Sequence, residues 1–163
     1  MPSTYEKIQT TTGNGSTATI TFSTIPATYT DLVIVASVIN SNGSDSLSLR
    51  LNGDTGSNYS YTVLGNSGST PESYRSSNNT YMQCGLELDT SPCPNIIQVM
   101  NYANTTTNKT VIARGGQGDT RTRAIVGLWR NTAAITSITL RNPSGAGAYS
   151  TSSTFTLYGI KAA

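Results

Sequence analysis

The chain has 163 residues, of which 36% are hydrophobic and only 11% are charged, and its net charge is +2. A chain of this length is expected to form one domain, residues 1–163, and to bury roughly 68–70% of its unfolded surface without disulfides or metals. The small charge does not predict a nucleic-acid partner, and the lack of an apolar stretch near about 18 residues predicts no membrane-spanning helix.

Short apolar clusters of strand length follow one another along the whole chain. Many are rich in β-branched or alternating residues, and none has the periodicity of an amphipathic helix. The expected strands, in chain order, are Tyr5–Gln9, Ser16–Phe22, Leu32–Val38, Leu47–Leu51, Tyr59–Leu64, Tyr81–Leu88, Asn95–Tyr102, Lys109–Arg114, Arg121–Trp129, Ile135–Leu140 and Thr154–Ile160.

Two of these strands are apolar at both odd and even positions. Leu32–Val38 is apolar apart from Ser37, and Arg121–Trp129 carries Ile125 and Trp129 on one side and further apolar residues on the other. Such strands are expected to be covered on both faces. The remaining strands alternate, which is typical of strands with one solvent-exposed face.

The segments between the strands are polar. Gly65–Asn79 contains almost no aliphatic residue and is predicted to be a long surface loop. Residues 81–102 are expected to form a hairpin that turns near Thr90 and Ser91. Short strands separated by turns at this spacing predict an all-β fold, and specifically an antiparallel, jelly-roll-like β-sandwich of about ten strands.

No catalytic motif stands out. The chain has no histidine, which excludes Ser-His-Asp, Cys-His and histidine-based metal sites. Its eight carboxylates are scattered, and Asp45, Asp54, Asp89 and Asp119 lie in predicted turns, where such residues are common. A glycosidase needs only two carboxylates brought together by the fold, so that alternative stays open. The sequence otherwise predicts a protein that is not an enzyme and has no cofactor.

The segment Asn52–Tyr59 has oxygen-bearing side chains at alternating positions, which a calcium ion could use. One carboxylate is too few for a tight site, so a turn capped by Asp54 and Asn58 is the favoured interpretation. Cys84 and Cys93 are the only thiols, and their offset in the expected hairpin predicts that they do not form a disulfide.

Arginines and tyrosines supply the candidate binding residues. Arg114, Arg121 and Arg123 belong to a local excess of positive charge that also includes Arg130. This group is either a solvated strand face or a patch for an acidic protein or a carbohydrate. Tyr74 belongs to a group of tyrosines around the predicted long loop. An apolar ring with a polar tip suits both protein interfaces and the stacking of sugars.

Five segments together carry a resemblance to a known group of proteins: Met1–Glu6, Phe22–Leu32, Arg50–Tyr61, Gly127–Thr132 and Ser153–Lys161. They resemble small virion structural proteins of tailed bacteriophages, including phages that infect cyanobacteria. The resemblance runs from end to end and implies a jelly-roll-like capsid cement or decoration protein. It supplies no catalytic residue.

The resemblance implies that the protein is located in the virion, is a homotrimer, and bridges subunits of the major capsid protein. Docking would then use Gly65–Asn79 and the N-terminal segment Met1–Lys7, because both are polar and easily ordered on a partner. The alternative is a tail-fibre, baseplate or lectin-like module that binds a host glycan through exposed tyrosines. No secretory signal is recognisable at the N-terminus, so assembly in the host cytoplasm is expected.

Overall fold

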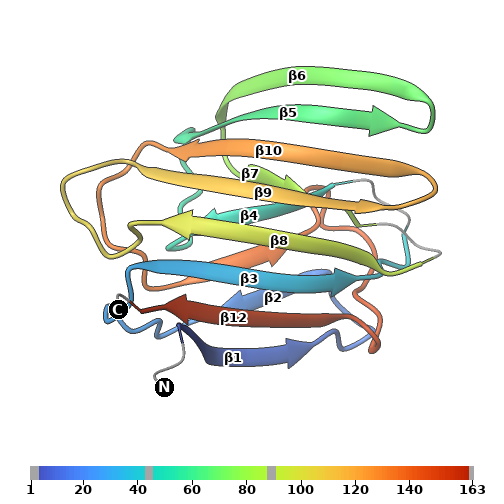
Figure 1. Ribbon diagram of the computed structural model, residues 1–163. Helices are drawn as coiled ribbons and strands as arrows, with labels where there is room; N and C mark the ends of the chain where they lie inside the picture. The colour runs from blue at the N-terminus through green and yellow to red at the C-terminus, as the bar shows by residue number, and fades with distance from the viewer. Residues whose placement is uncertain (1–3, 43–45, 88–90, 162–163) are drawn as a thin grey trace.

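A computed structural model describes residues 4–42, 46–87 and 91–161 and shows two antiparallel β-sheets packed face to face (Figure 1). This confirms the expected all-β sandwich. Among the described residues, none forms a helix of the length and apolar character needed to cross a membrane. The strands are β1 (Tyr5–Thr12), β2 (Thr19–Phe22), β3 (Asp31–Val38), β4 (Leu47–Leu51), β5 (Tyr59–Ser67), β6 (Thr70–Asn79), β7 (Met82–Gly85), β8 (Cys93–Met100), β9 (Lys109–Gln117), β10 (Arg121–Trp129), β11 (Ile138–Arg141) and β12 (Thr154–Ile160).

The two sheets differ in size. The large sheet has eight strands in the order β1-β12-β3-β8-β9-β10-β5-β6, and the small sheet has four in the order β2-β11-β4-β7. β3 and β8 lie near the middle of the large sheet, as expected of the longest apolar run. β1 and β6 are its two edges, and β7 is an edge of the small sheet that lies over β9 and β10.

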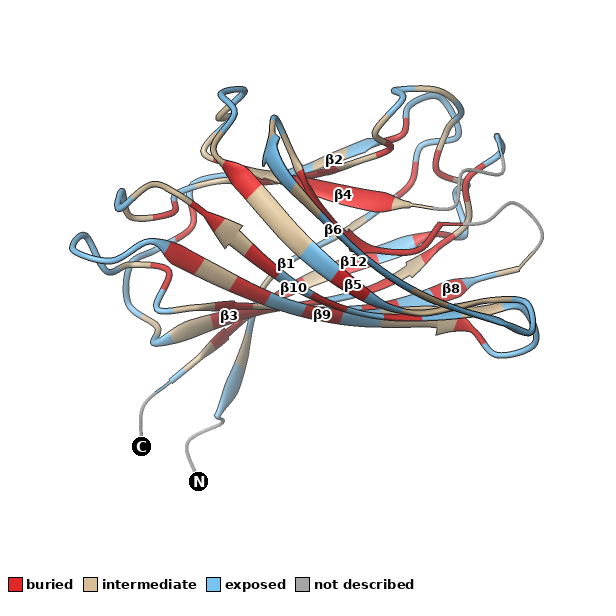
Figure 2. Ribbon diagram, turned by 90° about the horizontal axis from the view of Figure 1, so that it is seen from above, coloured by how far each residue is buried: buried red, intermediate tan, exposed pale blue. Residues whose placement is uncertain are grey.

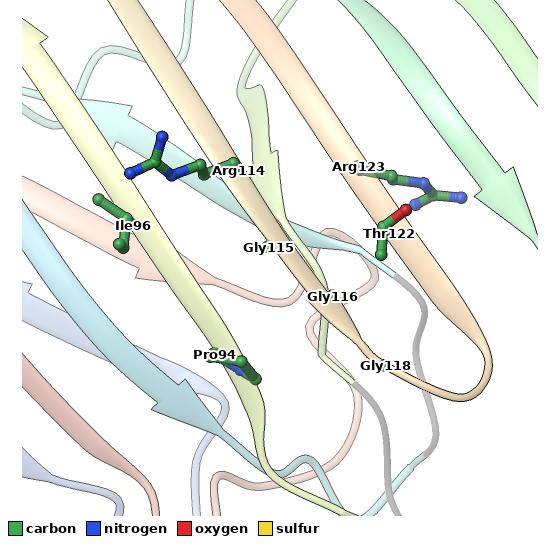
Figure 3. A pocket seen from close by; sticks show the side chains of 8 residues that line it. All are labelled: Pro94, Ile96, Arg114, Gly115, Gly116, Gly118, Thr122 and Arg123. Atoms are coloured by element: carbon green, nitrogen blue, oxygen red, sulfur yellow. The ribbon is translucent and has the colours of Figure 1, made fainter.

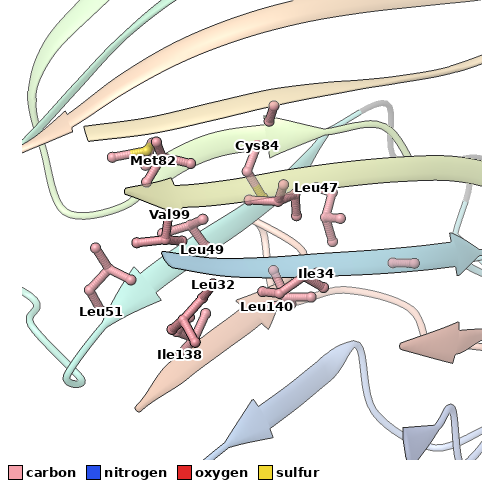
Figure 4. Packing of buried hydrophobic residues seen from close by; sticks show 14 of the residues in the cluster. Leu32, Ile34, Leu47, Leu49, Leu51, Met82, Cys84, Val99, Ile138 and Leu140 are labelled. Carbon is pink, nitrogen blue, oxygen red and sulfur yellow. The ribbon is translucent and has the colours of Figure 1, made fainter. Parts of the chain in front are cut away.

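The core fills the space between the sheets. Alternate residues of β3, including Leu32 and Ile34, point inward from the large sheet and are fully buried. They meet leucines and isoleucines of the small sheet, among them Leu49 and Leu140, which are also fully buried (Figure 4). Burial of such side chains stabilises each by about 1.5–3 kcal/mol relative to exposure, so this layer is the main source of stability.

The prediction that two strands are covered on both faces is wrong. In β3, Val35 is 45% exposed, and in β10, Val126 is 54% exposed. Figure 2 shows the buried and exposed residues alternating along β9 and β10, because the small sheet covers only one side of the large sheet. The outer side of the large sheet therefore carries aliphatic side chains that no other part of the described chain covers.

Two further expectations are also wrong. Gly65–Asn79 is not a loop: β5 continues to Ser67 and pairs with the ten-residue strand β6, with Thr70 opposite Ser67. The residues of β6 are polar and mostly exposed because the strand lies at the edge of the sheet, where they need no apolar partners. Residues 81–102 are not a hairpin either, since β7 pairs with β4 in the small sheet and β8 pairs with β3 and β9 in the large sheet.

Candidate functional site

The three arginines singled out in the sequence do not form one patch. Arg121 and Arg123 share the inner face of β10, as their spacing predicts, but Arg114 in β9 pairs with Ala124 and points to the outer face. Arg123 is only 5% exposed, whereas Arg114 is exposed. A single cationic docking surface made of these residues is therefore excluded by the pleat of the sheet.

Arg123 belongs to a buried polar network at the open edge of the sandwich. Its Nε donates to Glu72 Oε1 on β6, and its Nη1 lies 3.4 Å from Ser46 Oγ. Ser46 precedes β4, so the guanidinium joins the large sheet to the small one. A buried arginine needs such a carboxylate partner to offset its desolvation. The role of Arg123 is thus to hold the two sheets at this edge.

The same network continues through Tyr74 to β7. The Tyr74 hydroxyl donates to Gln83 Oε1 at 2.7 Å, and Gln83 Nε2 donates to Ser46 Oγ at 2.6 Å. Gln83 is only 3% exposed, although it points away from the core side of β7, because the hairpin β5–β6 passes over it. Tyr74, a predicted site residue, therefore lies at a cleft between the two sheets.

That cleft contains a small polar pocket of about 200 Å³. Two tyrosine rings, Tyr61 of β5 and Tyr81 just before β7, lie on its wall with Ser46 and Gln83. The loop after β11 closes it through Asn142, Pro143 and Ser144. The pocket thus combines aromatic rings with amides and hydroxyls contributed by both sheets.

Asn142 carries an unsatisfied hydrogen-bond donor at this pocket. Its Oδ1 accepts from the backbone N–H of Ser144 at 2.9 Å and from the Ser144 hydroxyl at 2.7 Å, which fixes the orientation of the amide. Asn142 is fully buried, and its Nδ2 has no partner among the described residues. A buried amide donor without an acceptor costs about 1–3 kcal/mol, a cost that the fold carries at this position.

Tyr61 of the pocket is uncharged at neutral pH. Burial raises the pKa of Tyr61, and a hydrogen bond with Ser76 offsets only part of that effect. The phenol therefore stays protonated and can both donate and accept hydrogen bonds. Within residues 4–42, 46–87 and 91–161, no group of three or more acidic, cysteine or histidine side chains is placed to hold a metal ion.

The turn at Asn52–Tyr59 is built as the favoured interpretation expected. Asp54 Oδ1 accepts from the Gly56 N–H at 2.7 Å, and its Oδ2 accepts from Asn58 Nδ2 at 2.9 Å and from the indole of Trp129 at 2.6 Å. The carboxylate is thus surrounded by donors that belong to the fold. Such a carboxylate caps a turn and holds the core, and it is not positioned as a calcium ligand.

Both thiols are buried, Cys84 in β7 and Cys93 in β8, and neither is bridged. Burial raises the pKa of the Cys84 thiol well above its ordinary value. A thiol of this kind behaves as a small apolar side chain rather than as a nucleophile.

Comparisons with known proteins give only distant similarities. No family model matches the chain, and no curated protein matches it by sequence. Among solved structures, the galectin LEC-6 of Caenorhabditis elegans aligns over 90% of this chain and 94% of its own, with 6% identity and a TM-score of 0.41. Toad ovary galectin in complex with thio-digalactose covers 85% and 98%, with 11% identity and a TM-score of 0.40. The alginate lyase Aly36B with an alginate tetrasaccharide covers 83% and 72%, with 7% identity and a TM-score of 0.33.

At these TM-scores no ligand or activity can be transferred to this chain. The pocket itself contains five residues that the sequence analysis did not single out: Ser46, Gln83, Asn142, Pro143 and Ser144. They come from three separate parts of the chain, which only the fold brings together. The single sequence signal in the right place was the group of tyrosines that includes Tyr61, Tyr74 and Tyr81.

Proposed function

We propose that this protein is a non-enzymatic binding module that holds one polar ring of a carbohydrate in the cleft between β5–β6 and β7. The observation that carries this proposal is a pocket that joins the tyrosine rings of Tyr61 and Tyr81 to the hydroxyl and amide groups of Ser46, Gln83 and Ser144. Polar groups and aromatic rings that converge in one concave site are the usual composition of a small-ligand pocket.

A carbohydrate fits the remaining chemistry of the pocket. A sugar ring has hydroxyls that donate and accept around its rim, and apolar C–H faces that pack on aromatic rings, which tyrosines can supply. The volume of about 200 Å³ is below the range of about 300–1,000 Å³ that is usual for drug-sized ligands, so one ring is the appropriate size. The neutral amides and hydroxyls of Ser46, Gln83 and Ser144 favour a neutral hydroxyl-rich ligand over a highly charged one.

The test is a titration of the folded protein with a panel of neutral mono- and oligosaccharides, followed by amide chemical shifts and by calorimetry. We expect binding that is weakened at least about tenfold by Tyr81→Ala and by Tyr61→Ala, because each removes one aromatic ring from the pocket wall. Tyr5→Ala, at an exposed tyrosine on the opposite edge of the large sheet, is the matched control and should bind normally. Binding that is equally strong in all four proteins would refute the assignment of this pocket.

The second candidate function is that of a virion structural protein, as the resemblance implies. The edge strand β6 favours it: one side of β6 has no partner strand among the described residues, and its side chains are mostly exposed. An open edge of this kind can add a strand from a partner such as a major capsid protein.

The segment Gly65–Asn79 thus remains a proposed docking element, now as a hairpin. Of the N-terminal segment Met1–Lys7, residues 1–3 lie outside the described residues, and Tyr5–Lys7 belong to the opposite edge strand β1.

Phage particles distinguish the two roles. A cement protein, trimeric or not, raises the temperature at which particles release DNA, and adding purified protein back to depleted particles restores it by mass action. Depleted particles that keep their heat stability but fail to adsorb to cells would exclude the cement role and favour the glycan-binding role.

A further inference from the structure

The outer face of the large sheet carries a stripe of exposed aliphatic side chains. Every large aliphatic residue that is strongly exposed in the described part of the chain lies on this face. Exposed fractions are 45% for Val35, 64% for Leu64, 39% for Ile96, 46% for Ile112 and 54% for Val126. We call these five residues the outer stripe.

Strand register makes the outer stripe continuous across five strands. Val35 of β3 is directly opposite Ile96 of β8, and Ile112 of β9 is directly opposite Val126 of β10. Leu64 of β5 is opposite Ala124, the residue two positions before Val126 on the same face. Directly opposite and diagonal neighbours on one face lie within side-chain reach of each other. The five residues are therefore one surface and not isolated apolar positions.

The surface along the outer stripe is hollowed. Gly116 lacks a side chain on this face and leaves a depression of about 420 Å³ beside Ile96 and Arg114, which Figure 3 shows on the neighbouring strands β8 and β9. A second depression of about 360 Å³ lies between Leu64, Ile112 and Val126. Hollows of this size can receive side chains of a second apolar sheet, while the aliphatic side chains beside them fill hollows of that sheet, as in sandwich cores.

The footprint of the outer stripe is large enough for a specific dimer. Five strands from β3 to β5, at about 4.8 Å spacing and with about seven residues each at about 3.4 Å, give roughly 570 Å² on each copy. Two such faces together exceed the total of about 1,000 Å² that a specific interface needs. Continuous apolar surface is also rare on proteins that remain monomeric.

Charge is sparse at the centre of this face. On β8, β9, β10 and β5 the outward-pointing described residues include no carboxylate, and Arg114 is the charged residue among them. Asp31 of β3 and Arg75 of β6 lie at the margins of the face. A partner for the centre must therefore be mainly apolar, and a second copy of this chain is always present at equal concentration. Each copy has a net charge of +2, so screening by salt favours association.

We propose that two copies of this chain pair through their outer stripes, face to face and with two-fold symmetry. The pairing is independent of the proposed carbohydrate pocket, which lies between the sheets at the edge formed by β6 and β7. It leaves that pocket open on both copies, so a dimer would present two ligand sites.

Sedimentation equilibrium and light scattering over a wide range of protein concentration test the pairing. We expect a mass near twice the 17.2 kDa of one chain, with association strengthened by raising the ionic strength. Val126→Glu should return the protein to a monomer, because it places two carboxylates in the centre of the interface. Thr21→Glu, an exposed residue on the outer face of the small sheet, adds the same charge elsewhere and should leave the dimer intact.

Val126 is exposed in the single chain, so Val126→Glu should keep the circular dichroism spectrum of the folded protein, and its mass is then interpretable. A monomer at every concentration would overturn the proposal. So would an oligomer, including a trimer, whose mass Val126→Glu does not change. A dimer that dissociates with rising salt would equally contradict an apolar interface between two like-charged chains.

Discussion

The indole Nε1 of Trp129 donates a hydrogen bond of 2.6 Å to Oδ2 of Asp54, and this bond ties the end of β10 to the turn after β4. Trp129 is 1% exposed and stacks on Tyr59 with ring centroids 6.3 Å apart, and the Tyr59 hydroxyl in turn accepts from the backbone N–H of Leu51 at 3.0 Å. The turn therefore closes one end of the sandwich by satisfying the polar atoms of two large buried aromatic side chains.

Asp54→Asn should destabilise the protein by about 1–3 kcal/mol, because an amide cannot accept from Trp129, Asn58 and Gly56 together, and one buried donor loses its partner. Trp129 is the only tryptophan, so its fluorescence reports directly on this site and should change in the native state. Chemical denaturation gives the change in stability. Asp119→Asn, in the exposed turn between β9 and β10, is the control and should alter neither quantity. Equal stability of both variants would contradict a structural role for Asp54.

Acid should weaken this end of the sandwich through Asp54. Desolvation raises the pKa of its carboxyl group, but hydrogen bonds from Trp129, Asn58 and Gly56 more than offset that effect and hold the pKa below the ordinary value of 3.8. A carboxyl whose pKa is lower in the folded state stabilises the protein above its unfolded pKa. That contribution is lost as the pH falls from 3.8 through the folded pKa. Denaturation measured between neutral pH and acid should show this loss in the native sequence and a smaller one in Asp54→Asn.

Trp129→Ala should cost about 3–5 kcal/mol, since it removes the largest buried side chain and leaves a cavity against Tyr59. The substitution also removes the donor to Asp54. Unfolding must be followed by circular dichroism, because the variant has no tryptophan. A loss below roughly 1 kcal/mol would mean that the site is not a packed part of the core.

The sequence predicted the class of fold and most strands because the apolar clusters that form them are local. The bounds of β10 and β12 were predicted correctly from apolar runs that stop at polar residues. The β6 strand was missed because its ten residues contain no aliphatic side chain; an edge strand with two wet faces leaves no hydrophobic signal. The exposure of Val35 depends on whether a second layer packs on the outer face of the large sheet. The local sequence pattern does not encode the presence or absence of such a layer.

The candidate site was even less predictable. Tyr74 lies at it, and Arg123 lies beneath it, but Arg114 is on the opposite face and Asn142 carried no signal at all. Its unpartnered amide becomes visible only once the loop after β11 meets β7. Local residue types could suggest a tyrosine-rich binding surface, and only the topology shows which polar side chains surround it.

Two glycines in extended strands should respond differently to the same substitution. A Cβ on Gly115 would lie 2.0 Å from Asn95 Oδ1, and a Cβ on Gly127 would lie 2.1 Å from the Sδ of Met82. Met82 is flexible and can move its sulfur away. Asn95 cannot move as easily, because its side chain accepts from the Leu86 N–H at 2.8 Å and donates to the carbonyls of Leu86 and Cys93 at 2.9 Å each.

Gly115→Ala should therefore destabilise the protein by about 1–3 kcal/mol through the lost hydrogen bonds of buried groups, and by more than Gly127→Ala. Thermal or chemical denaturation of the two single variants gives this ranking directly. The decisive control is Asn95→Ala combined with Gly115→Ala. The shortest contact is with the asparagine, so Gly115→Ala should cost less stability in the Asn95→Ala background than in the native sequence. Additive losses would show instead that the alanine at position 115 meets the Pro94 carbonyl, whose oxygen lies 2.8 Å from the same Cβ, and that Asn95 is not what requires glycine there.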